Sequence, residues 1–232
     1  MKSFNIKIIF YSLFVLVISL QSCNGTGNSG VSEGIIKYDI TYPYYKDKFM
    51  LSMMPAEMRM EFKGDKYRNT VDNSMFGSSL ISNCKDSTLI MLLHFGQKKI
   101  YSELDVALTD TMIKRNGVPD IIALNSTDSL AGILCEKYMG VFEKLEDGYD
   151  CEVFEAKGIA LENSNWCNPY RGIGGVLLGY EIDQYGLQMR FKAVEVKETI
   201  INDSIFNVPS SYKKVSLDRM LYEVEEIFKN LL

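Results

Sequence analysis

The stretch Gly34-Ile35-Ile36-Lys37-Tyr38-Asp39-Ile40-Thr41-Tyr42 alternates apolar and polar side chains. Successive side chains of a β-strand point to opposite faces, so a period of two predicts a strand with one apolar face. The same alternation returns at 58–63, follows the turn signal Gly64-Asp65 into 66–72, and appears again at 187–193. The sequence therefore predicts a sheet whose strands bury one face each.

Three further patterns extend this sheet. Leu89–Leu93 is a continuous apolar run, which is typical of a strand that is buried on both faces. The alternation that begins at 187 changes phase at Val194, which indicates a β-bulge. Segments 136–143 and 149–156 flank Asp147-Gly148, a strong signal for a hairpin turn.

Two segments favour helices. Val106–Asn116 has weak helical periodicity and is followed by Gly117-Val118-Pro119, which predicts a short helix that stops there. The last segment is clearer, because Ser216 is placed to cap it and apolar residues then recur at helical spacing. These residues are Leu217, Met220, Leu221, Val224, Ile227, Phe228 and Leu231. We expect this stripe to lie on the sheet.

The chain has 232 residues, of which 47% are hydrophobic, and it shows no internal repeat or interdomain linker. This length and composition predict a single domain over residues 32–232. The most irregular part of that domain is 163–175, which contains the only tryptophan, three asparagines and three glycines in close succession. We expect it to be a glycine-rich surface loop between strands.

Residues 1–22 have the features of a signal peptide. Lys2 and Lys7 are followed by an uncharged apolar stretch from Ile8 to Leu20, which is too short to span a membrane comfortably. The segment ends Leu20-Gln21-Ser22-Cys23, which resembles the lipobox of bacterial lipoproteins, although Gln21 departs from the usual small or aliphatic residue. The resemblance implies cleavage before Cys23 and acylation of that residue.

A lipidated Cys23 makes the membrane a partner through the acyl anchor. Each buried methylene contributes about 0.8 kcal/mol, so two chains already anchor stably, and the glycine-rich segment 23–31 is then a flexible tether. Removal of residues 1–22 takes two of the 25 basic residues and none of the 30 acidic ones, leaving a formal net charge of −7. This acidic balance argues against a nucleic-acid partner, which needs clustered lysine and arginine. The expected location is the bacterial cell envelope, on the outer membrane, with the face left open.

The remaining cysteines fit an oxidising compartment without deciding their state. Four cysteines in a periplasmic domain are compatible either with small buried thiols or with at least one disulfide, and the sequence does not choose a pairing. Their spacing contains no CxxC unit, which argues against a zinc site and a redox dithiol. These residues are Cys84, Cys135, Cys151 and Cys167.

No motif for catalysis or a cofactor emerges. His94 is the only histidine, so a multi-histidine metal site is excluded, and a single histidine at a strand end is typical of a structural side chain. The sequence contains no combination of nucleophile, base and orienting group that would identify an active site. We therefore expect a non-catalytic protein without a metal or cofactor.

Several segments, taken in order, resemble a group of uncharacterised bacterial lipoproteins whose domain is similar to the LolA/LolB lipoprotein carriers. They are Gly34–Tyr42, Met58–Arg68, Gly96–Tyr101, Gly132–Tyr138, Gly174–Ile182 and Ile205–Lys213. The resemblance covers roughly residues 32–215. It implies a mainly β (α+β) fold, with a curved antiparallel sheet forming an open half-barrel, helices across its concave side, and an apolar cavity that holds acyl chains.

Five of the 12 methionines lie between Met50 and Met60. Methionine is unbranched and polarisable, so it suits surfaces that accept varied apolar ligands, although Met58 and Met60 are also compatible with an ordinary core. We expect Met58, Met60 and Phe62 to contact an acyl or other lipid ligand on the concave face. Ten buried methylenes would contribute on the order of 8 kcal/mol before ordering costs.

Two functions therefore follow from the sequence. The first is a membrane-anchored envelope lipoprotein that binds a hydrophobic ligand in the concave face. The alternative is a structural lipoprotein whose sheet is a scaffold for another envelope protein. A helix packed on the sheet without a void favours the scaffold, whereas a roomy apolar cleft favours ligand binding.

Overall fold

The computed structural model describes residues 30–73, 76–115, 117–142, 148–184 and 187–231. The signal peptide 1–22, the anchor residue Cys23 and nearly all of the tether 23–31 lie outside this part of the chain, as does the hairpin turn at 143–147.

One sheet of twelve strands dominates the molecule. The strands are β1 (Glu33–Thr41), β2 (Glu57–Lys63), β3 (Lys66–Asp72), β4 (Phe76–Asn83), β5 (Thr88–Phe95), β6 (Lys98–Leu104), β7 (Asp120–Leu130), β8 (Ile133–Phe142), β9 (Tyr149–Ala156), β10 (Leu177–Gln184), β11 (Leu187–Glu198) and β12 (Lys213–Lys214). Their order is β12-β6-β5-β4-β3-β2-β1-β11-β10-β9-β8-β7, so the two edge strands do not meet. All neighbours are antiparallel except β12, which runs parallel to β6.

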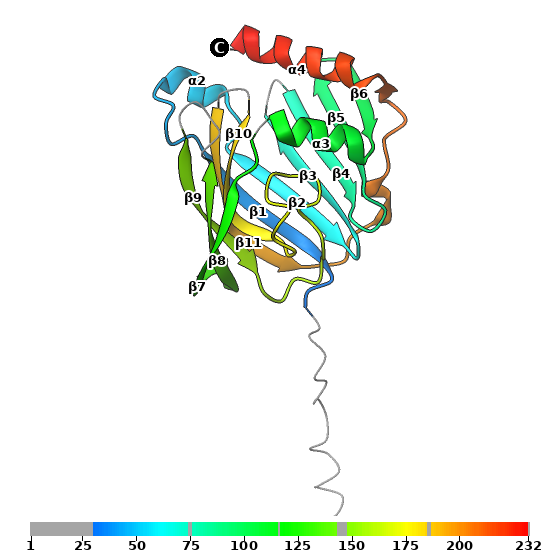
Figure 1. Ribbon diagram of the computed structural model, residues 1–232. Helices are drawn as coiled ribbons and strands as arrows, with labels where there is room; N and C mark the ends of the chain where they lie inside the picture. The colour runs from blue at the N-terminus through cyan, green and yellow to red at the C-terminus, as the bar shows by residue number, and fades with distance from the viewer. Residues whose placement is uncertain (1–29, 74–75, 116, 143–147, 185–186, 232) are drawn as a thin grey trace, which may run out of the picture.

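The sheet curls into an open bowl (Figure 1). This arrangement, with helices at one rim of the bowl, confirms the predicted mainly β fold with a curved antiparallel sheet that does not close. β1 lies at the centre and pairs with β2 on one side and β11 on the other. The register between β1 and β11 jumps from Lys37↔Glu195 to Tyr38↔Ala193, so Val194 is the extra residue of the predicted bulge.

Three α-helices line the rim at which the bowl opens (Figure 1). α3 (Val106–Arg115) and α4 (Leu217–Leu231) agree with the predicted helices. α2 (Lys48–Met53) was not predicted, because six residues without a buried position carry no apolar periodicity. Its start is fixed by Asp47, whose carboxylate accepts hydrogen bonds from the backbone N–H groups of Phe49 and Met50.

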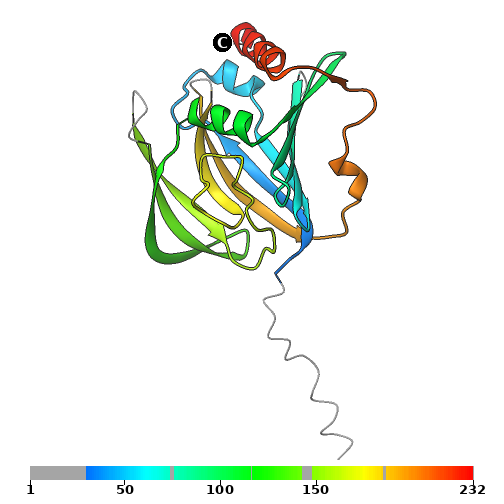
Figure 2. The same ribbon diagram turned by 45° about the vertical axis from the view of Figure 1, so that its right-hand side comes forward.

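The convex side is covered along β3 to β6 by segment 200–212, seen in orange-brown in Figure 2. This segment contains a 3-10 turn, η1 (Asp203–Phe206), and Phe206 packs there against Ile81 and Leu92. The Arg68 guanidinium holds it by donating a hydrogen bond of 3.1 Å to the carbonyl of Ile205. Because segment 200–212 covers the outer face of the sheet here, β5 is buried on both faces, as its apolar run predicts.

The concave side is filled at one end by residues 157–176, which we call the plug (Figure 2). The predicted surface loop at 163–175 is therefore irregular but not superficial, and that part of the prediction is wrong. Trp166 and Tyr170 are buried, and the Trp166 indole donates a 2.8 Å hydrogen bond to the hydroxyl of Ser82 on β4. The Asn165 amide donates to the carbonyls of Ile173 and Gly175, so the plug satisfies its own backbone without regular structure.

Candidate functional site: an apolar cavity in the concave face

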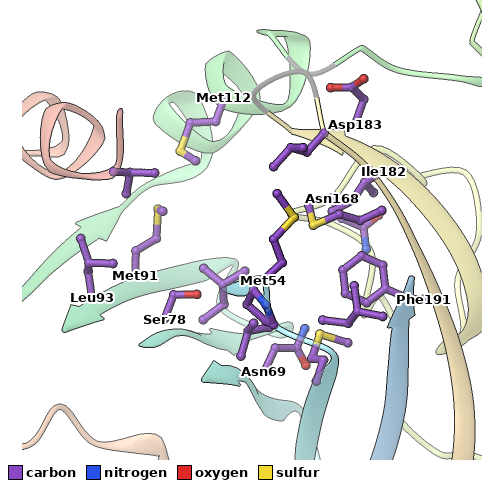
Figure 3. Close-up of a pocket in the computed structure, with 18 of the residues that line it drawn as sticks. Met54, Asn69, Ser78, Met91, Leu93, Met112, Asn168, Ile182, Asp183 and Phe191 are labelled. Atoms are coloured by element: carbon purple, nitrogen blue, oxygen red, sulfur yellow. The ribbon is translucent and has the colours of Figure 1, made fainter. Parts of the chain in front are cut away.

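The other end of the concave face is hollow. A cavity of about 300 Å³ lies between the inward faces of the central strands and the three rim helices, and we call it the methionine cavity (Figure 3). Alternation along each strand determines which residues reach it, so that on β3 Tyr67, Asn69 and Val71 line the cavity while Arg68 faces the convex side. Its size is at the lower end of the range for ligand pockets in proteins.

Seven of the 12 methionines line this cavity, and they come from strands, helices and a loop that are far apart in sequence. They are Met50, Met53, Met54, Met58, Met91, Met112 and Met189. The remaining wall is mostly leucine, isoleucine, valine and aromatic side chains. Thioether side chains can adopt several rotamers at low cost, so the wall can adjust to apolar ligands of different shape.

Few polar groups interrupt this wall. Apart from tyrosines and Cys167, the polar lining residues are Asn69, Ser78, Thr109, Asn168 and Asp183. Thr109 donates its hydroxyl to the Asp105 carbonyl. Among the lining residues that the structure describes, Asp183 is the only aspartate or glutamate, and lysine, arginine and histidine are absent.

Burial keeps the tyrosines and the cysteine of the wall uncharged. It raises the pKa of Tyr42 to about 12 and the pKa of Tyr67 well above its usual range. The pKa of Cys167 is also raised by burial, against the opposing effect of its hydrogen bond with Tyr67. At neutral pH Tyr42, Tyr67 and Cys167 are therefore uncharged.

The rim helices are held in different ways. α4 packs Met220 and Ile227 against Phe76, Leu93 and Ile100. Its Glu223 carboxylate accepts a 2.6 Å hydrogen bond from Lys98, which lowers the pKa of that carboxyl. By contrast, α2 has no buried residue, and Phe49 on its outer side is 70% exposed.

The three residues expected to touch a ligand occupy successive depths along β2. Met58 lines the methionine cavity, whereas Met60 lines a smaller pocket further in. Phe62 lies in the core and lines neither space. The geometry thus supports Met58 as a cavity residue and gives no support for ligand contact by Phe62.

Sequence reasoning missed other cavity residues. Met91, Met112 and Met189 are isolated in the sequence, and only the fold brings them together at the cavity. Asn69 was also missed, because the single polar residue on an otherwise apolar face of β3 shows no pattern in the sequence.

The four cysteines that the structure describes are free thiols: Cys84, Cys135 and Cys151 are buried and Cys167 is partly buried. Burial raises the pKa of Cys84 to about 12, with a further contribution from nearby Cys167. Thiols in such surroundings are poor nucleophiles at neutral pH.

No catalytic arrangement is visible in the described ranges. His94 lies on the face of β5 opposite Leu93 and the cavity, with its imidazole Nε2 3.4 Å from an Asp72 carboxylate oxygen. Within residues 30–73, 76–115, 117–142, 148–184 and 187–231, no group of histidine, cysteine, aspartate or glutamate side chains could hold a metal ion. In the same ranges no helix has the length and apolar character needed to cross a membrane.

Comparison with known proteins shows a similarity of fold only. No family model matches this chain, and no curated protein matches it. Two solved structures of PNGF-II, in different space groups, share the fold with TM-scores of 0.51 and identities of 11% and 10%. They cover 82% and 83% of this chain, but this chain covers only 32% of PNGF-II. The chain therefore spans about a third of the length of the structures it resembles, and the likeness concerns the fold alone.

Proposed function

We propose that this protein is a lipid-anchored, non-catalytic protein of the bacterial envelope that holds an acyl chain or another apolar ligand in the methionine cavity. The observation that carries this proposal is the cavity itself: about 300 Å³ bounded mostly by apolar side chains, beside a plug in which Trp166 and Tyr170 are buried. Side chains that face such a cavity make fewer packing contacts than side chains in a filled core. A ligand that fills the void recovers those contacts.

The volume of the cavity also favours ligand binding over the alternative function as a structural scaffold. A scaffold needs only a rigid sheet, and a rim helix such as α4 could have packed on that sheet without a void. Instead Val224 and Ile227 of α4 line the cavity and leave it open beneath them. The experiments below also test the scaffold function.

A chain could enter the cavity beside α2. Met50 and Met53 of this helix line the cavity, yet the helix contributes no buried residue, so displacing it exposes little apolar surface. Its end is tied to the sheet by the Asn73 amide, which donates a 2.9 Å hydrogen bond to the carbonyl of Met53. We assign α2 as the movable part of the rim.

The cavity can be tested with pyrene, a hydrocarbon whose emission spectrum reports the polarity around it. A protein that begins at residue 24 retains every element described here and is suitable for this measurement. Met91→Trp places a larger side chain in the cavity and should reduce pyrene binding at least tenfold. Met139→Trp is the matched control, because Met139 on β8 is half-buried but lines neither pocket, and it should bind pyrene like the unmodified protein.

Two results would count against ligand binding. One is a protein that does not take up pyrene at all, and the other is equal uptake by both tryptophan variants. The first would favour the scaffold, with a search for a protein partner as the next step.

The anchor has its own test. Replacing Cys23 with Ala should abolish acyl labelling in cells and release the protein from the membrane fraction. Acyl labelling that persists in Cys23→Ala would refute the lipobox interpretation without affecting the cavity.

A further inference from the structure

A second, much smaller space adjoins the methionine cavity at its inner end, between the sheet and the plug. It has a volume of about 30 Å³, and we call it the polar pocket. Its wall shares five residues with the larger cavity: Met58, Tyr67, Asn69, Asn168 and Tyr180. The two spaces are therefore neighbours that meet at this ring.

The polar pocket contains two buried atoms without partners. The Asn69 side-chain oxygen and the Ser164 hydroxyl oxygen are both inaccessible, and neither has a hydrogen-bond partner in the protein. Ser164 is only 4% exposed and comes from the plug, whereas Asn69 comes from β3. A buried polar atom without a partner destabilises the protein, so a small polar group that reached both atoms would stabilise it.

Several other polar groups of the pocket already have hydrogen-bond partners. The Tyr38 hydroxyl donates to the Leu177 carbonyl at 2.8 Å. The Asn168 amide donates to Asn165, and its oxygen accepts from the backbone N–H of Tyr170. Tyr67 donates its hydroxyl to the Ser164 carbonyl at 3.2 Å. The Asn69 side-chain oxygen and the Ser164 hydroxyl oxygen differ from these groups in having no partner in the protein.

The volume of the polar pocket and the charge of its lining limit the chemical groups that it can bind. A volume of about 30 Å³ is the space of one water molecule, or of one small group such as a hydroxyl. The described lining of both spaces contains no lysine, arginine or histidine, so an ionised carboxylate or phosphate would be buried without a counter-charge. Asp183, the one lining carboxylate, lies on the opposite side of the cavity from Asn69 (Figure 3).

We propose that the polar pocket receives the uncharged hydroxyl end of an amphiphile whose chain lies in the methionine cavity, with Asn69 and Ser164 as its hydrogen-bond partners. This assignment rests on the proposed function and names the class of ligand: neutral, single-chain and hydroxyl-bearing, as opposed to an ionised fatty acid. A hydroxyl both donates and accepts, so it can satisfy the Asn69 oxygen and the Ser164 hydroxyl together. It would take the place of one water molecule.

The test is displacement of pyrene by 1-decanol and by decanoate at pH 8, which have the same chain length and differ in the charged state of the head. Decanol should displace pyrene at least tenfold more effectively. Ser164→Ala should weaken decanol displacement by about fivefold to tenfold, the value of one hydrogen bond, and leave pyrene binding unchanged, because Ser164 lines only the polar pocket. Asn69→Leu should weaken decanol displacement by a similar factor, relative to pyrene binding measured in the same variant. Ser129→Ala is the control, because Ser129 on β7 is exposed and lines neither space, and it should change neither.

The thermal stability of the two variants provides a second test of the hydroxyl assignment. Because Asn69→Leu and Ser164→Ala remove atoms that have no partner, both variants should have thermal midpoints equal to or above that of the unmodified protein. Equal potency of decanol and decanoate, unchanged decanol displacement in both variants, or a clear drop in both midpoints would overturn the assignment to a hydroxyl ligand. Loss of pyrene binding in the unmodified protein would instead refute the proposed function, so the two failures are distinguishable.

Discussion

The two ends of the concave face are made by the same strands, yet one is closed by the plug and the other is left hollow. On β1 and β2, Ile36 and Phe62 are buried in the core at the plug end. Ile40 and Met58, further along the same strands, line the methionine cavity. The plug end shows that this chain can fill a curved sheet with irregular backbone. The hollow at the other end is therefore a feature to be explained by function.

The largest difference between the two ends should appear when a side chain is shortened. Trp166→Ala at the plug end removes a buried indole and its hydrogen bond to Ser82, and should lower the free energy of unfolding by about 3–5 kcal/mol. Met91→Ala beside the cavity only enlarges an existing void, and should cost less than the roughly 2 kcal/mol at which buried Met→Ala changes begin. Urea unfolding of both variants gives the comparison. Equal losses would mean that the two ends are packed alike.

A matched pair of asparagines sharpens the same contrast. Asn165→Ala leaves the buried carbonyls of Ile173 and Gly175 without their donor, and should destabilise the protein by about 1–3 kcal/mol. Asn69→Ala removes an amide whose oxygen has no partner, and should be close to neutral in the same assay. A strongly destabilised Asn69→Ala protein would show that its amide is satisfied within the fold.

Alkaline pH should weaken the plug end through Cys84. Burial raises the pKa of this thiol from 9.0 to about 12, so the unfolded chain loses the proton first. Its contribution to stability is complete below pH 9 and is lost as the pH rises from 9 towards 12. The free energy of unfolding, measured by urea titration at a series of pH values, should fall less steeply over this window in Cys84→Ala than in the unmodified protein. Parallel curves would rule out this thiol as a contributor.

The smallest effect concerns oxidation of the methionines by dilute peroxide. Met50, Met53 and Met54 at the rim are partly exposed, whereas Met60 and Met220 are at most 4% exposed. The rim residues should be converted to sulfoxides first, as followed by peptide mass spectrometry, and a bound apolar ligand should slow their conversion. Oxidation of Met60 at the same rate as Met53 would indicate that the bowl opens as a whole.

The strands with a clear period of two could be predicted from sequence almost to the residue, and so could the bulge at Val194. β4 could not, because Ser79 faces outward towards Arg68 while Ser82 faces inward to Trp166, so serine interrupts the apolar alternation on both faces. β7 is an edge strand with mostly exposed side chains, and its polar sequence resembles a loop.

The methionine cavity could be predicted only in part from the sequence. The methionines at 50–58 are clustered in sequence and were identified, whereas Met91 and Met189 join them only through strand pairing across the sheet. The plug was taken for a surface loop because its burial depends on contacts with distant strands, such as that between Trp166 and Ser82. Such contacts produce no recognisable pattern among residues that are neighbours in the sequence.

Native mass spectrometry of the protein beginning at residue 24, isolated from a bacterial periplasm rich in lipid, is the most direct test of ligand binding in the methionine cavity. We predict an additional acyl-bearing mass that is lost on denaturation, absent from Met91→Trp and retained by Met139→Trp. A bare chain that remains bare after incubation with lipids, in the unmodified protein as in both variants, would contradict the proposal.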